Sequence, residues 1–233
     1  MPDLSFAIEG VEAVQSTASP LVALKLRIKN GSSTEAIHTG VLRCQAQIET
    51  ARRRYSAAEQ DRLSDLFGTP ERWAQTLRPL LWANTHVIVP SFTADTLVEV
   101  QLPCSFDFNI ASTKYFAGLE DGDIAITLLF SGTIFYKTSG AALQIAQVPW
   151  DKEAGCRVPV TLWREIIDAC YPNSAWISLR RDVFDRLYEY KIRRGIPTWE
   201  DTFEQLLGAA EGGFGTPAPL PGKRESRRSG GEA

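Results

Sequence analysis

Residues 22–29, Val-Ala-Leu-Lys-Leu-Arg-Ile-Lys, carry the clearest structural pattern of the chain and decide its fold class. Apolar side chains at every second position alternate with basic ones: Val22, Leu24, Leu26 and Ile28 against Lys25, Arg27 and Lys29. Successive side chains of a β-strand point to opposite faces. The alternation therefore predicts a strand with one buried face and one face in water.

Further strands are predicted on both sides of this segment. Leu42, Cys44, Ala46 and Ile48 repeat the alternation, and the shared parity places Cys44 on the core face. Other strands are predicted at 6–14, 86–89, 98–108, 124–136 and 143–148, and Gly132 is typical of a bulge. About seven or eight strands of this kind favour a two-sheet antiparallel sandwich.

Helical patterns occur in two places. Ser56 followed by Glu59 fits a capping box and predicts a small helical insertion over residues 56–79. After Pro159 the apolar residues follow helical spacing at Trp163, Ile166, Ile167 and Cys170. Ser178 is then the expected N-cap of a helix over 179–194, and Thr198 that of a final short helix.

The predicted architecture is mostly β (α+β): an antiparallel two-sheet β-sandwich with a small helical insertion and C-terminal helices packed on it. One domain is expected over residues 1–208. Residues 209–233 contain six Gly and three Pro and almost no large apolar side chains. Such a segment cannot bury enough surface to offset the entropy of ordering, so a disordered tail is predicted there.

Composition limits the partners and the compartment. The formal net charge is −3, which gives no overall attraction to nucleic acid or to an anionic membrane. No apolar run approaches the ~20 residues that span a bilayer, so no membrane span is predicted. The first residues, Met-Pro-Asp-Leu-Ser-Phe, lack the basic and apolar regions of a secretory signal. We therefore expect a cytoplasmic protein.

No catalytic site, metal site or cofactor is predicted. The chain has two isolated histidines, His38 and His86, and four widely spaced cysteines without a C-x-x-C pair. Zinc, heme and most acid–base sites use histidine or clustered cysteine. The glycine-rich phosphate loops and the G-x-S-x-G motif of hydrolases are also missing. The residues therefore predict a protein that is not an enzyme.

Five residues near the C-terminus are candidates for protein interaction: Trp176, Arg180, Arg181, Tyr188 and Trp199. Trp176 and Trp199 lie at loop-to-helix junctions, where a tryptophan either joins two elements or anchors an interface. The arginines belong to a basic helix that also carries acidic residues at i, i+4 spacing. These charges are explained either by local ion pairs or by an acidic partner.

The same region resembles a known family. The residues that carry the resemblance are 148–151 (Val-Pro-Trp-Asp), 171–176 (Tyr-Pro-Asn-Ser-Ala-Trp), 179–188 (Leu-Arg-Arg-Asp-Val-Phe-Asp-Arg-Leu-Tyr) and 194–200 (Arg-Gly-Ile-Pro-Thr-Trp-Glu). Together they resemble an uncharacterised family of bacterial proteins encoded in gene clusters of nickel–iron uptake hydrogenases. The resemblance implies a context, hydrogenase assembly or maturation, and no catalytic residues. The cysteine patterns of the hydrogenase subunits themselves are absent from this chain.

The expected function is therefore a non-enzymatic accessory protein that binds a protein partner, and the resemblance implies hydrogenase subunits or their maturation factors as that partner. Two alternatives stay open. One is a holdase-like chaperone with an apolar groove, which an exposed contiguous apolar patch would favour. The other is an enzyme whose site is assembled from scattered residues, which a deep pocket with perturbed carboxylates would favour.

Overall fold

The computed structural model describes residues 2–14, 17, 19–32, 35–106, 109–138 and 142–211. Contacts divide the chain into two compact units, Met1–Trp176 and Ile177–Ala233. The division falls at Trp176, short of the boundary at 208 that the sequence predicted for a single domain. Packing explains the position, because helix α5 (Val160–Cys170) still buries four residues whereas helix α6 (Arg181–Arg194) buries none.

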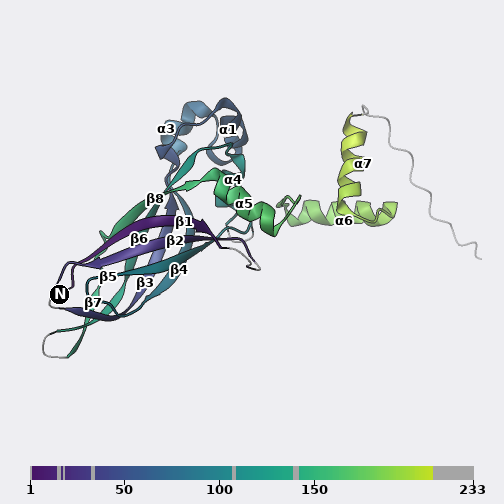
Figure 1. Cartoon of the computed structure of the whole chain (residues 1–233). Helices are drawn as coiled ribbons and strands as arrows, with labels where there is room; N and C mark the ends of the chain where they lie inside the picture. The colour runs from purple at the N-terminus through teal and green to yellow at the C-terminus, as the bar shows by residue number, and fades with distance from the viewer. Residues whose placement is uncertain are drawn as a thin grey trace, which may run out of the picture. The chain divides into compact units, whose positions relative to one another are not determined.

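The first unit is a sandwich of two antiparallel sheets, so the predicted fold class is confirmed (Figure 1). One sheet has the strand order β1-β2-β5, and the other has the order β4-β3-β6-β7, with β8 also paired to β6. The strands are Leu4–Ala13 (β1), Leu21–Asn30 (β2), Ala36–Ile48 (β3), Leu80–Val89 (β4), Asp95–Pro103 (β5), Asp123–Lys137 (β6), Leu143–Gln147 (β7) and Glu153–Pro159 (β8).

Strand β2 confirms the alternation on which the fold prediction rests. Val22, Leu24, Leu26 and Ile28 are all fully buried between the sheets. On the opposite face, Arg27 reaches Glu9 of β1 at 3.0 Å and Asp95 of β5 at 2.8 Å. Lys25 likewise pairs with Glu99 of β5 at 2.9 Å. The outer face of this sheet is therefore a set of cross-strand ion pairs in water, and the core lies on its other side.

Strand β6 pairs with three other strands of the second sheet, β3, β7 and β8. Its first half pairs with β8 and its second half with β7, so these two short strands follow one another along the same side of β6. Gly132 lies between the two halves with a φ of 144°. The sequence suggested a bulge there, but Gly132 stays in register opposite Leu42 of β3. Close approach of the two backbones, not an extra residue, explains this glycine.

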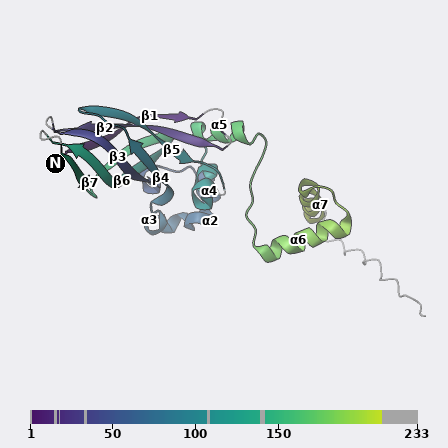
Figure 2. The ribbon, with the colours of Figure 1, turned by 90° about the horizontal axis from the view of Figure 1, so that it is seen from below.

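The helices of the first unit gather at one end of the sandwich, and strand β7 lies at the other end (Figures 1 and 2). The insertion between β3 and β4 consists of η1 (Thr50–Arg52), α1 (Ala57–Arg62), α2 (Ser64–Phe67), η2 (Pro70–Arg72) and α3 (Trp73–Thr76). Helix α4 (Ile110–Gly118) follows β5, and α5 follows β8. The predicted strand over 98–108 was too long, because β5 ends at Pro103 and Asn109 caps α4 through Ser112 N at 3.1 Å.

The second unit contains two helices, α6 and α7 (Trp199–Glu211). Gly195 ends α6 in the left-handed conformation, with φ 66°, as a C-terminal glycine commonly does. Thr198 caps α7 as predicted, since its Oγ1 accepts from Asp201 N at 3.1 Å. Helix α6 begins at Arg181 rather than at 179, and Ser178 does not cap it. Of the predicted tail, residues 209–211 belong to α7, and 212–233 lie outside the described residues.

Candidate functional site

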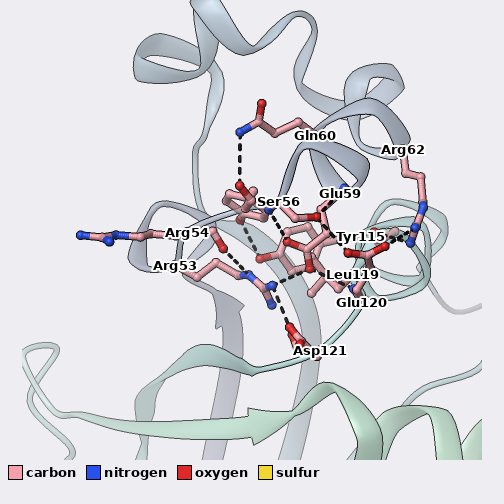
Figure 3. A network of polar contacts seen from close by, with 12 residues as sticks. Arg53, Arg54, Ser56, Glu59, Gln60, Arg62, Tyr115, Leu119, Glu120 and Asp121 are labelled. Carbon is pink, nitrogen blue, oxygen red and sulfur yellow. Dashed lines mark hydrogen bonds and ion pairs between the residues drawn. The ribbon is translucent and has the colours of Figure 1, made fainter.

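A buried carboxylate lies where the helical insertion meets the sandwich (Figure 3). Glu59 of α1 is 2% exposed. Its Oε2 accepts from Ser56 N at 2.9 Å, completing the predicted capping box. Its Oε1 accepts from Arg53 Nη2 at 2.7 Å and from Glu120 N at 2.9 Å. Both oxygens are thus bound by donors of the chain itself, which favours a structural role over a role in acid–base chemistry.

Arg53 completes this buried ion pair. Its side chain is 9% exposed and also donates to the carbonyls of Arg54 and Asp121, at 3.3 and 3.2 Å. The guanidinium lies 5.2 Å from the centre of the Tyr55 ring. Its Nη1 atom is buried and has no hydrogen-bond partner among the described residues. The pair therefore fastens the insertion to the loop that precedes β6.

Two tyrosines meet beneath this pair. The hydroxyl oxygens of Tyr55 and Tyr115 lie 2.8 Å apart, and Tyr55 donates to the carbonyl of Thr50 at 2.6 Å. Tyr115 must then donate to Tyr55. Burial raises the pKa of Tyr115 and that of Tyr55. Both phenols stay protonated near neutral pH, so neither is poised as a base.

Three of the four cysteines are equally unreactive by environment. Burial raises the pKa of Cys44 and of Cys104 to about 12, and that of Cys156 to about 11. The thiolate is the form that attacks electrophiles and binds metals. Within the described part of the chain, no group of three His, Cys, Asp or Glu side chains is placed to hold a metal ion. At the end of the sandwich where the helical insertion lies, the side chains described above thus contribute packing and hydrogen bonds.

Alkaline pH should destabilise the fold partly through Cys44. A folded-state pKa raised from 9.0 to about 12 means that the folded chain keeps a proton that the unfolded chain releases. The stabilisation is complete below pH 9.0 and is lost progressively as the pH rises toward about 12. We expect the urea midpoint to fall between pH 8.5 and 10.5, and to fall less in Cys44→Ala. An equal fall in both proteins would contradict the assignment to Cys44.

The five interaction candidates lie in both units. Trp176 belongs to the first unit, where it stacks on Phe106 at 5.7 Å and meets Tyr171 edge-on at 4.9 Å. Arg180 binds Asp182 through two hydrogen bonds, of 3.1 and 2.9 Å. Arg181 lies 3.8 Å from Asp185. These local ion pairs account for both arginines without an external partner.

Tyr188 and Trp199 do come together, where α6 meets the start of α7 in the second unit. Their ring centres are 6.3 Å apart, and Phe184 lies 5.3 Å from Trp199. Lys191 adds its Nζ to this cluster, 5.9 Å from the Trp199 ring, and donates to the carbonyls of Ile196 and Pro197. Trp199 is half-buried in this arrangement. Its first role is therefore to join α6 to α7.

The aromatic side of α6, which Trp199 covers only in part, is a surface of which the sequence analysis singled out Tyr188 alone. Phe184, Tyr188 and Ile192 are 42, 50 and 59% exposed. Their spacing of four residues places them on one side of the helix. Helix α6 has no buried residue, so this stripe is not part of a core. The i, i+4, i+8 spacing was available in the sequence, but charged neighbours on both sides obscured it. We call these three residues the α6 stripe.

Comparison with known proteins gives the family. A profile of DUF6084, described as a family of unknown function, matches residues 1–213. The chain belongs to the DUF6084 family. No curated protein sequence matches this DUF6084 chain. Within the described ranges, none of its helices combines the length and the apolarity that crossing a membrane requires.

Solved structures resemble the DUF6084 chain only distantly. The CARDB domain of a Pyrococcus furiosus protein has 12% identity and a TM-score of 0.26, with 67% of this chain and 91% of that domain covered. A protein from Archaeoglobus fulgidus has 13% identity and a TM-score of 0.27, with 65% and 94% covered. The match to β-glucosidase 3B of Thermotoga neapolitana has 10% identity and a TM-score of 0.27, over 67% of this chain but 17% of the glucosidase. At these values the likeness carries no argument about function.

Proposed function

We propose that this protein is a non-enzymatic accessory protein of the cytoplasm that binds a protein partner through helix α6. The observation that carries the proposal is the α6 stripe, because apolar and aromatic side chains left in water on a helix are typical of an interface. The satisfied Glu59 carboxylate and the protonated phenols and thiols support a binding role over catalysis.

The charges around the stripe support recognition through its apolar residues. Arg181 pairs with Asp185 and Arg193 with Glu189, each one turn apart on α6. Charges that neutralise one another locally attract a distant charged partner only weakly. An amphipathic helix of this kind binds by laying its apolar side into a hydrophobic groove. We therefore infer that the partner offers an apolar groove.

The proposed partner class comes from the sequence resemblance. Residues 179–188 and 194–200, which resemble proteins encoded beside nickel–iron uptake hydrogenases, overlap α6 and the start of α7. The resemblance and the exposed stripe thus fall on the same segment. On this basis the proposed partners are hydrogenase subunits or their maturation factors, and the proposed role is assistance in assembly or maturation.

Deleting the gene from the native host should lower hydrogen uptake and slow the processing of the hydrogenase large subunit. Complementation with the wild-type gene should restore both, and Ile192→Lys should not. A charge placed in an apolar groove should weaken binding at least tenfold, about the loss expected for a buried anchor residue. Binding is measured by capture from the induced host and mass spectrometry. Ile88→Lys is the matched control, because Ile88 is 75% exposed on the sandwich.

Each result has a separate meaning. Normal uptake and processing in the deletion strain would contradict the hydrogenase role. Full binding and complementation by Ile192→Lys would contradict docking through the α6 stripe. The purified variants must keep the circular dichroism of the wild type, because a loss of helix would explain the same failure through folding.

A further inference from the structure

Strand β7 forms an open edge of the larger sheet (Figure 2). It pairs with β6 on one side only, and among the described residues no strand pairs with its other side. The other outer strands of the two sheets each lie beside a strand of the opposite sheet, β1 beside β8 and β5 beside β4. An edge that is left uncovered offers a row of backbone donors and acceptors to another strand.

The hydrogen-bond pattern identifies the groups on that edge. Val148 N donates to Gly132 O at 2.9 Å, so this facing pair is hydrogen-bonded. In an antiparallel ladder, hydrogen-bonded pairs alternate with pairs that are not. Ala146 and Gln144 therefore bond to β6, and the residues between them direct their N–H and C=O groups outward. Those residues are Leu143, Ile145 and Gln147.

The side chains of β7 leave the edge accessible. Leu143 is 52% and Ile145 is 64% exposed. The strand Leu-Gln-Ile-Ala-Gln carries no charge. Natural edge strands are usually protected by a charged residue, a proline or a covering element. Trp150, which is 91% exposed, lies three residues beyond the strand and adds a large apolar side chain near its end.

We propose that β7 pairs antiparallel with β7 of a second copy of this chain and joins the two larger sheets across a two-fold axis. Such an interface is self-complementary, as a symmetric dimer requires. With Ile145 facing the second copy's Ile145, Leu143 faces the second copy's Gln147, and each facing pair exchanges both of its hydrogen bonds. Because the strand is uncharged, two copies pair along it without bringing like charges together.

The contact area sets the expected strength. Pairing of two five-residue strands buries less than the ~1,200 Å² of a standard interface. We therefore expect a reversible dimer with a Kd on the order of 10–100 µM. Sedimentation equilibrium of the full chain from ~5 to ~500 µM covers that range.

Substitutions locate the interface. Ile145→Lys brings two like charges together at the axis and should raise the Kd at least tenfold. Ile145→Pro removes an outward N–H that β6 does not use, so it should raise the Kd while the sandwich stays folded. Ile88→Lys is the control, because Ile88 is also exposed, at 75%, on β4 of the same sheet. Its Kd should equal that of the wild type.

A cysteine at the axis tests the register directly. In a hydrogen-bonded antiparallel pair the Cα atoms lie ~5.5 Å apart, within the range that a disulfide spans. Ile145→Cys should therefore form a covalent dimer under mild oxidation, and Ile88→Cys and the wild type should not. A chain that stays monomeric at every concentration overturns the proposal. So does a dimer that keeps its Kd in both Ile145→Lys and Ile145→Pro, or one that cross-links through Ile88→Cys instead.

Discussion

Replacing Glu59 with alanine should lower the free energy of unfolding by about 3–5 kcal/mol, because it leaves the buried Arg53 guanidinium without its counter-charge. The side chains of the pair are only 3% and 9% exposed, so water cannot replace the lost carboxylate. The substitution also removes the acceptor for Ser56 N and Glu120 N. Urea unfolding at neutral pH, followed by far-ultraviolet circular dichroism, measures the loss.

An exposed ion pair of the same insertion provides the control. Asp65 of α2 pairs with Lys114, and both side chains are about half exposed. Asp65→Ala should cost at most ~1 kcal/mol, the usual value for such a pair. The double variant Arg53→Met/Glu59→Leu should recover part of the loss, since no charge is then buried alone. A loss in Glu59→Ala as small as that in Asp65→Ala would show that the insertion is held by its apolar contacts instead.

The sequence predicted the parts of the fold that have two distinct faces. Strand β2 alternates because its outer side chains pair across the strands in water, so the period of two is visible in the amino-acid sequence. The parity of Cys44 gave its burial correctly. Helix α5 shows Trp163, Ile166 and Ile167 on one side, and all three are buried. In each case one face meets solvent, and contrast between faces is what a periodic pattern records.

Helix α4 was missed because it lacks that contrast. Ser112, Tyr115 and Phe116 share one side of the helix and are buried, but Thr113 and Gly118, which lie on other sides, are buried as well. A helix that is buried on most sides shows no period of 3.6 residues. Its capping residue, Asn109, was a local signal that could have revealed the start. The apolar run before it was read instead as one strand over 98–108.

The candidate sites depend on contacts that no local pattern contains. The capping box of Ser56 and Glu59 was predicted, but Glu120, whose N–H binds the same carboxylate, is 61 residues away. The division at Trp176 was missed for a related reason. The apolar residues of α6 indicate an amphipathic helix. A sequence alone does not say whether its apolar side packs against the rest of the chain or against a partner.

Replacing Gly132 with alanine should cost at least ~3 kcal/mol, because the new methyl group would meet backbone and not a movable side chain. A Cβ at this position would lie 2.1 Å from the carbonyl oxygen of Val41 and 3.0 Å from Cα of Leu42. The φ of 144° is also one that residues with a side chain rarely adopt. Relief would require β3 and β6 to separate at the centre of the larger sheet.

Two other glycines separate the clash from the strain. Gly122→Ala has a φ of 76° but no atom within 4 Å, so it should show the conformational cost alone, on the order of 1 kcal/mol. Gly155→Ala in β8 has an ordinary φ and its nearest neighbour at 3.9 Å, so it should be neutral or slightly stabilising. The urea midpoints of the three variants should therefore rise from Gly132→Ala, the least stable, through Gly122→Ala to Gly155→Ala. If Gly132→Ala unfolds at the same midpoint as Gly122→Ala, the backbone of β3 yields at Val41, and the two strands are less closely fixed than their separation implies.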